Sequence, residues 1–138
     1  SPLARIGPVW RFNDAYNASP SSCEAVLHLV EQSWRGRFHL LLGDMLELGE
    51  HAQRYHEALG RQAAHTRATS VTFVGQHGAA FMRGFASVSA LRVDWLPAAD
   101  SDTRGWCRAL SPGDLLVAKG SRGVHLETNL NGLRGRLG

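Results

Sequence analysis

The sequence has no long apolar run and only two cysteines. No window approaches the roughly 18 apolar residues that a membrane-spanning helix needs, and Ser1–Gly7 lacks the charged and apolar regions of a signal peptide. Cys23 and Cys107 fit neither a CxxC pair nor a disulfide framework, so we expect two reduced thiols. These absences argue against a membrane partner and a disulfide-stapled domain, and they predict a cytoplasmic protein.

Lysine is also nearly absent. Fourteen of the fifteen Lys and Arg residues are Arg, which leaves Lys119 as the only lysine of the chain. The formal net charge is +3, but the basic residues are scattered singly and no run of them forms a patch. We therefore expect no nucleic-acid partner, and the position of Lys119 becomes of interest.

The length and the apolar pattern predict one α/β domain over residues 1–138. A chain of this length holds one core, and 43% hydrophobic with 20% charged residues is the composition of a globular protein. Short apolar runs alternate with helical patterns, which indicates a Rossmann-like, mostly parallel sheet of five to six strands with helices on both faces. The runs are Val9–Phe12, Phe38–Leu42, Ser70–Val74, Leu91–Leu96 and Leu115–Ala118.

Each run is followed by turn residues and an expected helix. The first helix begins at Ser19-Pro20, as N-cap and N1, and ends near Gly36. The second covers Glu50–His65, with an apolar stripe on one side and i,i+4 ion pairs Glu50/Arg54 and Glu57/Arg61 on the other. Later helices are marked by Phe81 and Phe85, by Trp106 and Leu110, and by the leucine repeat Leu126, Leu130, Leu133 and Leu137.

Several motifs that would define an enzyme by themselves are missing. The chain has no GxxxxGK[ST] loop for nucleotide phosphates, no GxGxxG after a strand and no GxSxG elbow. His51 and His56 are five residues apart, whereas the zinc motif HExxH needs four, so we expect no metal site. The function must therefore be sought in the loops at the carboxyl ends of the strands.

Those loops carry polar groups suited to anions and nucleosides. In Lys119–Gly123, the glycines allow close backbone approach and Arg122 offers a fork for a carboxylate or phosphate; the alternative is an ordinary Gly-rich turn. Asp14, Tyr16 and Asn17 could hold a ribose or purine, or could form an Asx turn into a helix cap. In Gly43–Gly49, Asp44 and Glu47 could meet a cationic group, although capping of the following helix is favoured.

Three of these loops occur in the order and spacing of one family. They read Asp-Ala-Tyr-Asn-Ala-Ser-Pro, Leu-Gly-Asp-Met-Leu-Glu-Leu-Gly and Lys-Gly-Ser-Arg-Gly. From about Trp10 to Leu130 the chain resembles the carboxy-terminal domain of the Mur ligases. Two positions depart from the usual wording, because Ser19 stands where the family commonly has Asn, and Asn13 where it often has Asp.

The resemblance implies a domain of a three-domain, ATP-dependent amide ligase of peptidoglycan synthesis. The other two domains, absent from this chain, would hold the UDP-sugar and, through a P-loop, ATP with Mg. The family phosphorylates a substrate carboxylate, and an amine then attacks the acyl phosphate. In the branch with the closest wording, the substrate is UDP-N-acetylmuramoyl-tripeptide and the amine comes from D-alanyl-D-alanine.

The same resemblance assigns roles to the loop residues. Asp14, Tyr16 and Asn17 would lie near the adenine and ribose, whereas Lys119, Ser121 and Arg122 would face the incoming dipeptide or the reacting carboxylate. Because closure between domains assembles such a site, the isolated domain is expected to be inactive. The alternatives are a non-catalytic, doubly wound nucleotide- or anion-binding module and an interaction domain with solvated loops.

Overall fold

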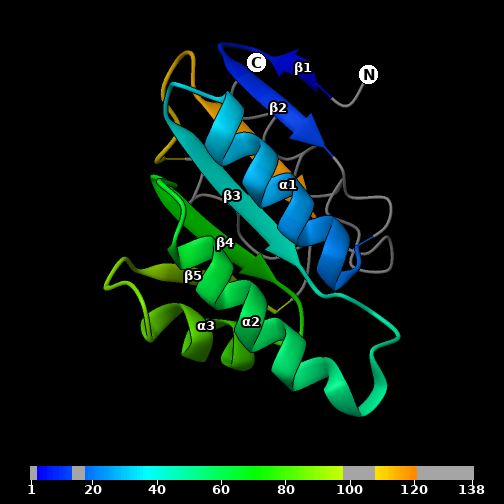
Figure 1. Cartoon of the computed structure of the whole chain (residues 1–138). Coiled ribbons are helices and arrows are strands. Elements are labelled where there is room, and N and C mark those ends of the chain that lie inside the picture. Colours follow the sequence, from blue (N-terminus) through cyan, green and yellow to red (C-terminus); the bar gives the residue numbers. More distant parts are fainter. Residues whose placement is uncertain (1–2, 14–17, 98–107, 121–138) are drawn as a thin grey trace.

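The computed structural model describes residues 3–13, 18–97 and 108–120 (Figure 1). All five expected strands are present, with ends within two residues of the prediction. The elements, in chain order, are β1 (Leu3–Ile6), β2 (Val9–Asn13), α1 (Pro20–Ser33), β3 (Phe38–Gly43), η1 (Gly49–His51), α2 (Ala52–Ala64), β4 (Ser70–Val74), α3 (Gly78–Ala86), β5 (Val93–Leu96) and β6 (Leu115–Lys119).

The strands form one sheet in the order β1-β2-β6-β3-β4-β5. β1 pairs antiparallel with β2, and the other five strands are parallel to one another. The last strand, β6, is inserted between β2 and β3 and is buried along its whole length. The parallel α/β sheet predicted from the sequence is therefore confirmed.

Helices α1, α2 and α3 cover one face of the sheet (Figure 1). This follows from right-handed crossovers, because the connections β2-α1-β3, β3-α2-β4 and β4-α3-β5 all move in the same direction along the sheet. The connection from β5 back to β6 runs in the opposite direction. The helices predicted around Trp106 and over the repeat from Leu126 to Leu137 lie outside the described residues.

The core lies between this sheet and its helices. Every residue of β3 is buried, as expected for a central parallel strand. Leu40 and Leu42 of β3 pack into one cluster with Val26 and Val30 of α1 and with Phe73 of β4. The Cys23 side chain is buried in the same cluster, as expected for a small apolar side chain.

Helix α1 begins as predicted. Ser19 is its N-cap: the Ser19 hydroxyl accepts a hydrogen bond from the Ser22 amide at 3.1 Å, and the Ser22 hydroxyl accepts one from the Ser19 amide at 2.9 Å. Pro20 occupies the first helical position, where its missing N–H has no partner to lose. A serine at this position thus performs the capping that an asparagine could also perform.

Helices α2 and α3 lie very close together. A Cβ on Gly84 of α3 would collide with the carbonyl oxygen of Glu57. This approach changes the predicted ion pairs of α2, because Glu57 pairs with Arg83 of α3 at 2.8 Å rather than with Arg61. Arg54 likewise does not pair with a glutamate but lies over the ring of Tyr55. Both predicted i,i+4 pairs are therefore wrong. Tertiary packing gives Glu57 a nearer partner, whereas Glu50 lies beside its neighbour His51.

Among the described residues, no helix is long and apolar enough to cross a membrane.

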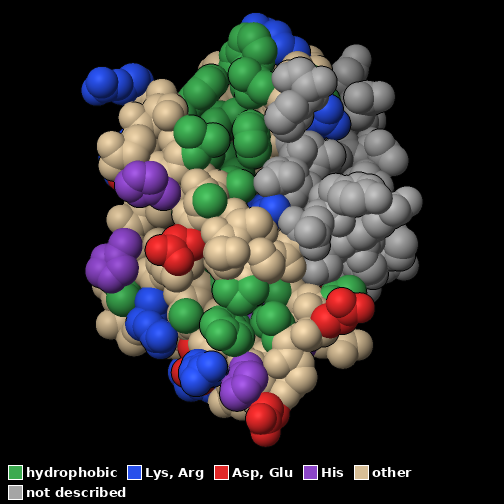
Figure 2. Space-filling model, turned by 45° about the vertical axis from the view of Figure 1, so that its right-hand side comes forward, with side chains coloured by type: hydrophobic (Ala, Val, Ile, Leu, Met, Phe, Trp, Pro, Cys, Tyr) green, Lys and Arg blue, Asp and Glu red, His purple; other side chains and the backbone are tan. Residues whose placement is uncertain are grey.

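Figure 2 shows the Lys and Arg side chains of one face dispersed among apolar and polar surface. This face therefore carries scattered basic residues, as the sequence indicates.

Candidate functional site at the carboxyl edge of the sheet

Parallel pairing brings the ends of the strands that precede the motif loops to one edge of the sheet. Strands β2, β6, β3 and β4 are neighbours that run in the same direction, so their carboxyl ends meet at what we call the carboxyl edge. Asn13 is in register with Ala118, and Lys119 with Leu42. Lys119, at the end of the central strand, therefore lies between the strands that precede the first and second motifs.

Lys119 is buried at this edge, with 2% of its surface exposed. Lysine is almost never fully buried unless its ammonium is paired, because an unpaired charge loses its hydration. A central, buried lysine at the carboxyl edge is thus a strong candidate for the site, as the sequence predicts for the only lysine of the chain.

Asp44 joins the second motif to the loop after β4. Its carboxylate accepts hydrogen bonds from the Gln76 amide at 2.8 Å and from the His77 amide at 3.0 Å, while its own amide donates to Val74 O. Gly75 has φ +136°, and a Cβ there would collide with the Asp44 carboxylate. The prediction that Asp44 caps the following helix is wrong: neither η1 nor α2 has a side-chain cap, and Asp44 holds the segment that leads into α3 instead.

His56 of α2 holds the next residue of the same loop. Its Nε2 accepts a hydrogen bond from the Met45 amide at 2.9 Å, and its Nδ1–H donates to Ala52 O at 2.7 Å. The side chain is completely buried. Burial lowers the pKa of His56, and nearby His77 acts in the same direction, so the ring is neutral near pH 7 and keeps the lone pair that accepts from Met45.

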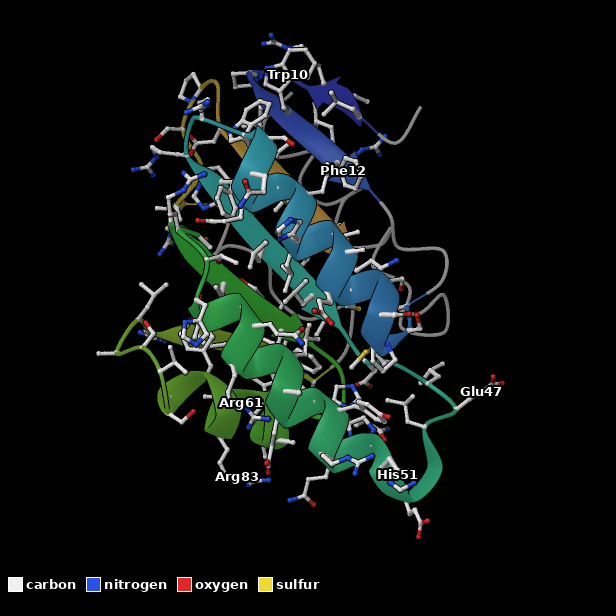
Figure 3. The ribbon with its side chains drawn as sticks, in the orientation of Figure 1. Trp10, Phe12, Glu47, His51, Arg61 and Arg83 are labelled. Atoms are coloured by element: carbon white, nitrogen blue, oxygen red, sulfur yellow. The ribbon has the colours of Figure 1, made fainter. Side chains whose placement is uncertain are left out.

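Glu47 lies at the exposed part of this loop. It has φ 63°, a left-handed conformation that is uncommon for a residue with a side chain. Figure 3 shows it on the connection between β3 and α2, directed away from the sheet. Neither η1 nor α2 has a side-chain cap, so the predicted capping role is wrong for Glu47 as well. The loop therefore presents a carboxylate to solvent from a backbone that is fixed at Asp44 and Met45.

A groove of about 280 Å³ runs between α1 and α2 beside this loop. Its lining includes Pro20 and Glu24 of α1, Tyr55 and Leu59 of α2, and Met45 of the loop. The bond from His56 to the Met45 amide thus also fixes one wall of the groove.

The remaining predicted site residues are not described by the structure. Asp14, Tyr16 and Asn17 follow β2, and Ser121 and Arg122 follow β6, so all of them lie outside the described residues. The roles assigned to them by resemblance stay predictions. The structure does bring the described ends of the two strands next to each other.

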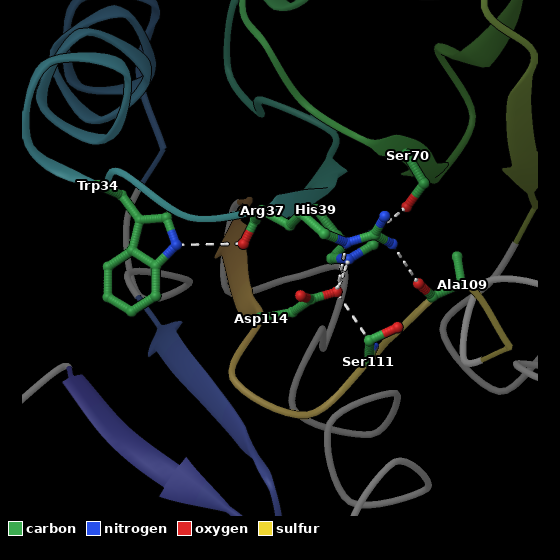
Figure 4. Close-up of polar contacts among 7 residues, drawn as sticks. All are labelled: Trp34, Arg37, His39, Ser70, Ala109, Ser111 and Asp114. Carbon is green, nitrogen blue, oxygen red and sulfur yellow. Dashed lines mark hydrogen bonds and ion pairs between the residues drawn. The ribbon is translucent and has the colours of Figure 1, made fainter.

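A second polar cluster lies at the opposite, amino edge of the sheet (Figure 4). His39 of β3 bonds through Nε2 to Asp114 Oδ2 at 2.7 Å and through Nδ1 to the Ser70 hydroxyl at 2.7 Å. Asp114 also accepts from the Ser111 amide and pairs with Arg37 at 3.3 Å. A carboxylate can only accept, so Nε2 of His39 carries the proton and Nδ1 accepts from the Ser70 hydroxyl.

Burial and charge set the protonation states of this cluster. Burial lowers the pKa of His39, with the hydrogen bond to Asp114 acting in the opposite direction. For Asp114, burial favours the neutral acid, but the hydrogen bonds from His39 and the Ser111 amide prevail and hold the pKa of the carboxyl below its usual value. The cluster is thus a neutral histidine that bridges a serine and an ionised aspartate.

Sequence reasoning missed both buried histidines, because it considered His56 only as a metal ligand and did not consider His39. A signal for His56 exists: it lies three and seven residues before Leu59 and Ala63, on the buried stripe of α2. Nothing comparable marks His39 and Asp114, whose contact depends on β6 pairing with β3.

Among the described residues, no group of three His, Cys, Asp or Glu side chains could hold a metal ion. The polar groups of the carboxyl edge are a buried lysine, amides fixed by Asp44 and His56, and an exposed carboxylate. Such an arrangement is suited to binding and orienting a charged substrate.

The fold and this edge define a class of protein. The chain matches the family "Mur ligase, glutamate ligase domain" over residues 3–122. It therefore belongs to that family, and the resemblance noted from the three loop motifs is confirmed. Several of its curated relatives are UDP-N-acetylmuramoyl-tripeptide–D-alanyl-D-alanine ligases.

The UDP-N-acetylmuramoyl-tripeptide–D-alanyl-D-alanine ligase of Bacillus subtilis is 35% identical over 117 residues, covering 83% of this chain and 26% of that protein. A MurF structure from Acinetobacter baumannii superposes with a TM-score of 0.85 at 25% identity, covering 96% of this chain and 30% of that one. MurF from Thermotoga maritima, solved in complex with ADP, shares the fold with a TM-score of 0.79 at 21% identity, covering 98% of this chain and 30% of that one. The chain thus spans about a quarter of the length of the B. subtilis relative.

Proposed function

We propose that this chain is the C-terminal domain of an ATP-dependent ligase that joins D-alanyl-D-alanine to UDP-N-acetylmuramoyl-tripeptide in peptidoglycan precursor synthesis. The observation that carries the proposal is the similarity to the B. subtilis ligase over 83% of the chain, together with a buried lysine beside the second motif at one sheet edge. The reaction would take place in the cytoplasm and would involve neither a nucleic acid nor a membrane partner.

In this reaction, ATP phosphorylates the terminal carboxylate of the tripeptide. The amine of the dipeptide attacks the acyl phosphate, phosphate leaves, and an amide bond forms. Lys119, with Ser121 and Arg122, would face the incoming dipeptide or the reacting carboxylate, because ammonium and guanidinium groups bind carboxylates and phosphates. Asp14, Tyr16 and Asn17 would contact the adenine and ribose.

The rest of the ligase would hold the UDP-sugar and ATP. The described residues offer no donor set for Mg, which the portion that binds ATP would hold. Domain closure would bring the carboxyl edge of this chain to the reacting groups. The chain alone should therefore turn over no ATP.

A domain exchange tests this function. The C-terminal domain of the B. subtilis ligase is replaced by this chain, and ADP release is measured with both substrates present and with each omitted. We expect ADP release that requires both substrates, and a large loss in the Lys119→Met and Arg122→Ala variants.

Two results would count against the function. One is a folded chimaera that binds ATP but forms no amide, while the parent enzyme is active in the same assay. The other is tight, saturable binding of ATP by the chain alone in calorimetry, which would favour the nucleotide-binding module.

A further inference from the structure

The motif loop after β3 is fixed where it leaves the core by a histidine on the following helix. His56 Nδ1–H donates to Ala52 O at 2.7 Å, which leaves the lone pair on Nε2. That lone pair accepts the Met45 amide at 2.9 Å. One ring thus links a helix to a loop amide, and it can do so only in the neutral form with the proton on Nδ1.

The other side of the loop is fixed at the preceding residue. Asp44 accepts the amides of Gln76 and His77, and the His77 ring stacks on His56 with centroids 4.3 Å apart. Residues 44 and 45 are therefore tied to α2 on one side and to the segment before α3 on the other. The next two residues, Leu46 and Glu47, are exposed.

Packing alone does not explain a histidine at this place. On the side away from His77, position 56 lies among apolar side chains, with the Phe73 ring edge-on at 6.0 Å and Met45 and Leu59 buried nearby. A phenylalanine there would fill a similar volume without the desolvation of two ring nitrogens. It would leave the Met45 amide without its acceptor, and that amide is the point from which the loop turns toward its exposed residues.

We propose that His56 is a positioning residue for ligation, which holds the Gly43–Gly49 loop in the shape that receives the amine substrate. This inference rests on the proposed function. The loop belongs to the second family motif, it carries an exposed carboxylate at Glu47 on a left-handed backbone, and it begins directly after Leu42, the register partner of Lys119. A loop released from His56 loses the fixed distance between its exposed carboxylate and the buried lysine.

The closing experiment uses the chimaera with three variants at this position. His56→Phe and His56→Ala remove the acceptor, whereas His56→Gln offers a carbonyl oxygen that can accept the Met45 amide. We expect kcat/KM for D-alanyl-D-alanine to fall about tenfold in the Phe and Ala variants, the effect of one buried hydrogen bond. KM for ATP should stay within about twofold, and the Gln variant should recover most of the activity.

Ala63→Gly is the matched control. Ala63 is buried on the same helix, two turns further along, and its change to glycine lowers helix stability without touching the loop. At equal loss of stability in urea, this variant should keep its kcat/KM. Equal losses in Ala63→Gly and His56→Phe, or full activity in His56→Phe, would overturn the inference.

A pH profile separates positioning from folding. The titratable groups that face His56 are Asp44 of the loop and His77 before α3. Burial holds the pKa of His56 low, so wild-type activity should fall in acid as its ring takes a proton, and His56→Gln should lack this step. An identical acid limb in both contradicts the inference, whereas an inactive wild-type chimaera contradicts the proposed function itself.

Discussion

Mild acid should destabilise this chain through its two buried histidines. The pKa of His39 and the pKa of His56 are both lowered by burial in the folded state. Below the ordinary histidine pKa of about 6.5, the unfolded chain takes up two protons that the folded chain does not. Stability therefore falls as the pH falls, beginning at the unfolded pKa and continuing to the folded one.

The size of the effect follows from proton linkage. One pH unit below the unfolded pKa, each histidine that stays neutral in the native state removes about 1.4 kcal/mol from the free energy of unfolding. Two such residues remove up to about 3 kcal/mol near pH 5.5, a large share of the ~5–15 kcal/mol that holds a domain together. Asp114, whose pKa is also held low, adds a further loss only below the ordinary Asp pKa of about 3.9.

Urea denaturation between about pH 7.5 and pH 5 measures this slope. The test variant is His39→Gln, because a glutamine amide can donate to Asp114 and accept from the Ser70 hydroxyl, yet takes up no proton. We expect about half of the acid-induced loss to disappear in this variant. A wild-type chain that keeps or gains stability in this range would refute the reasoning, as would a His39→Gln chain with the wild-type slope.

Three further substitutions test local features by urea denaturation. Gly84→Ala should destabilise by at least about 1–3 kcal/mol, because its Cβ meets the Glu57 carbonyl; an unchanged stability would mean that the α2–α3 approach is looser. Ser19→Ala should cost about 1 kcal/mol by removing the reciprocal cap with Ser22, whereas Ser19→Asn should be nearly neutral, and equal losses would contradict the capping role. The Arg67 guanidinium donates to the Glu31 carboxylate and to the carbonyl oxygens of Glu31 and Trp34 at the end of α1. Arg67→Lys should therefore cost about 1 kcal/mol, because an ammonium cannot make all three hydrogen bonds, and an unchanged stability would count against this role.

The elements that the sequence predicted are those with a strong local pattern. Ser70–Val74 is an apolar run of β-branched and aromatic residues between turns, and its bounds match β4. β1 was missed, because Leu3–Ile6 is a short edge strand whose exposed positions hold a leucine and an arginine, so its apolar residues do not follow the alternation of its burial. Its pairing with β2 depends on a hairpin rather than on its own sequence.

The hydrogen-bond and ion-pair partners of side chains could not be predicted from the local sequence in the same way. Glu57 has a suitable arginine four residues along its own helix, yet it pairs with Arg83, which only the α2–α3 packing brings near. Asp44 has a helix ahead of it to cap, yet it bonds to amides after β4. In each case a local rule gave one valid partner, and the tertiary fold supplied a nearer one.

The candidate site itself depends on strand order, which no local pattern states. If the strands followed chain order, β6 would lie beyond β5, and Lys119 would end at the far side of the sheet from Asn13. The insertion of β6 between β2 and β3 instead sets Ala118 beside Asn13 and Lys119 beside Leu42. The first three crossover connections move from β2 toward β5, and the connection from β5 to β6 moves back in the opposite direction to reach this central position. The strands that lead into the first and last motifs thus pair with each other, so a ligand that contacts both strand ends should also stabilise that pairing.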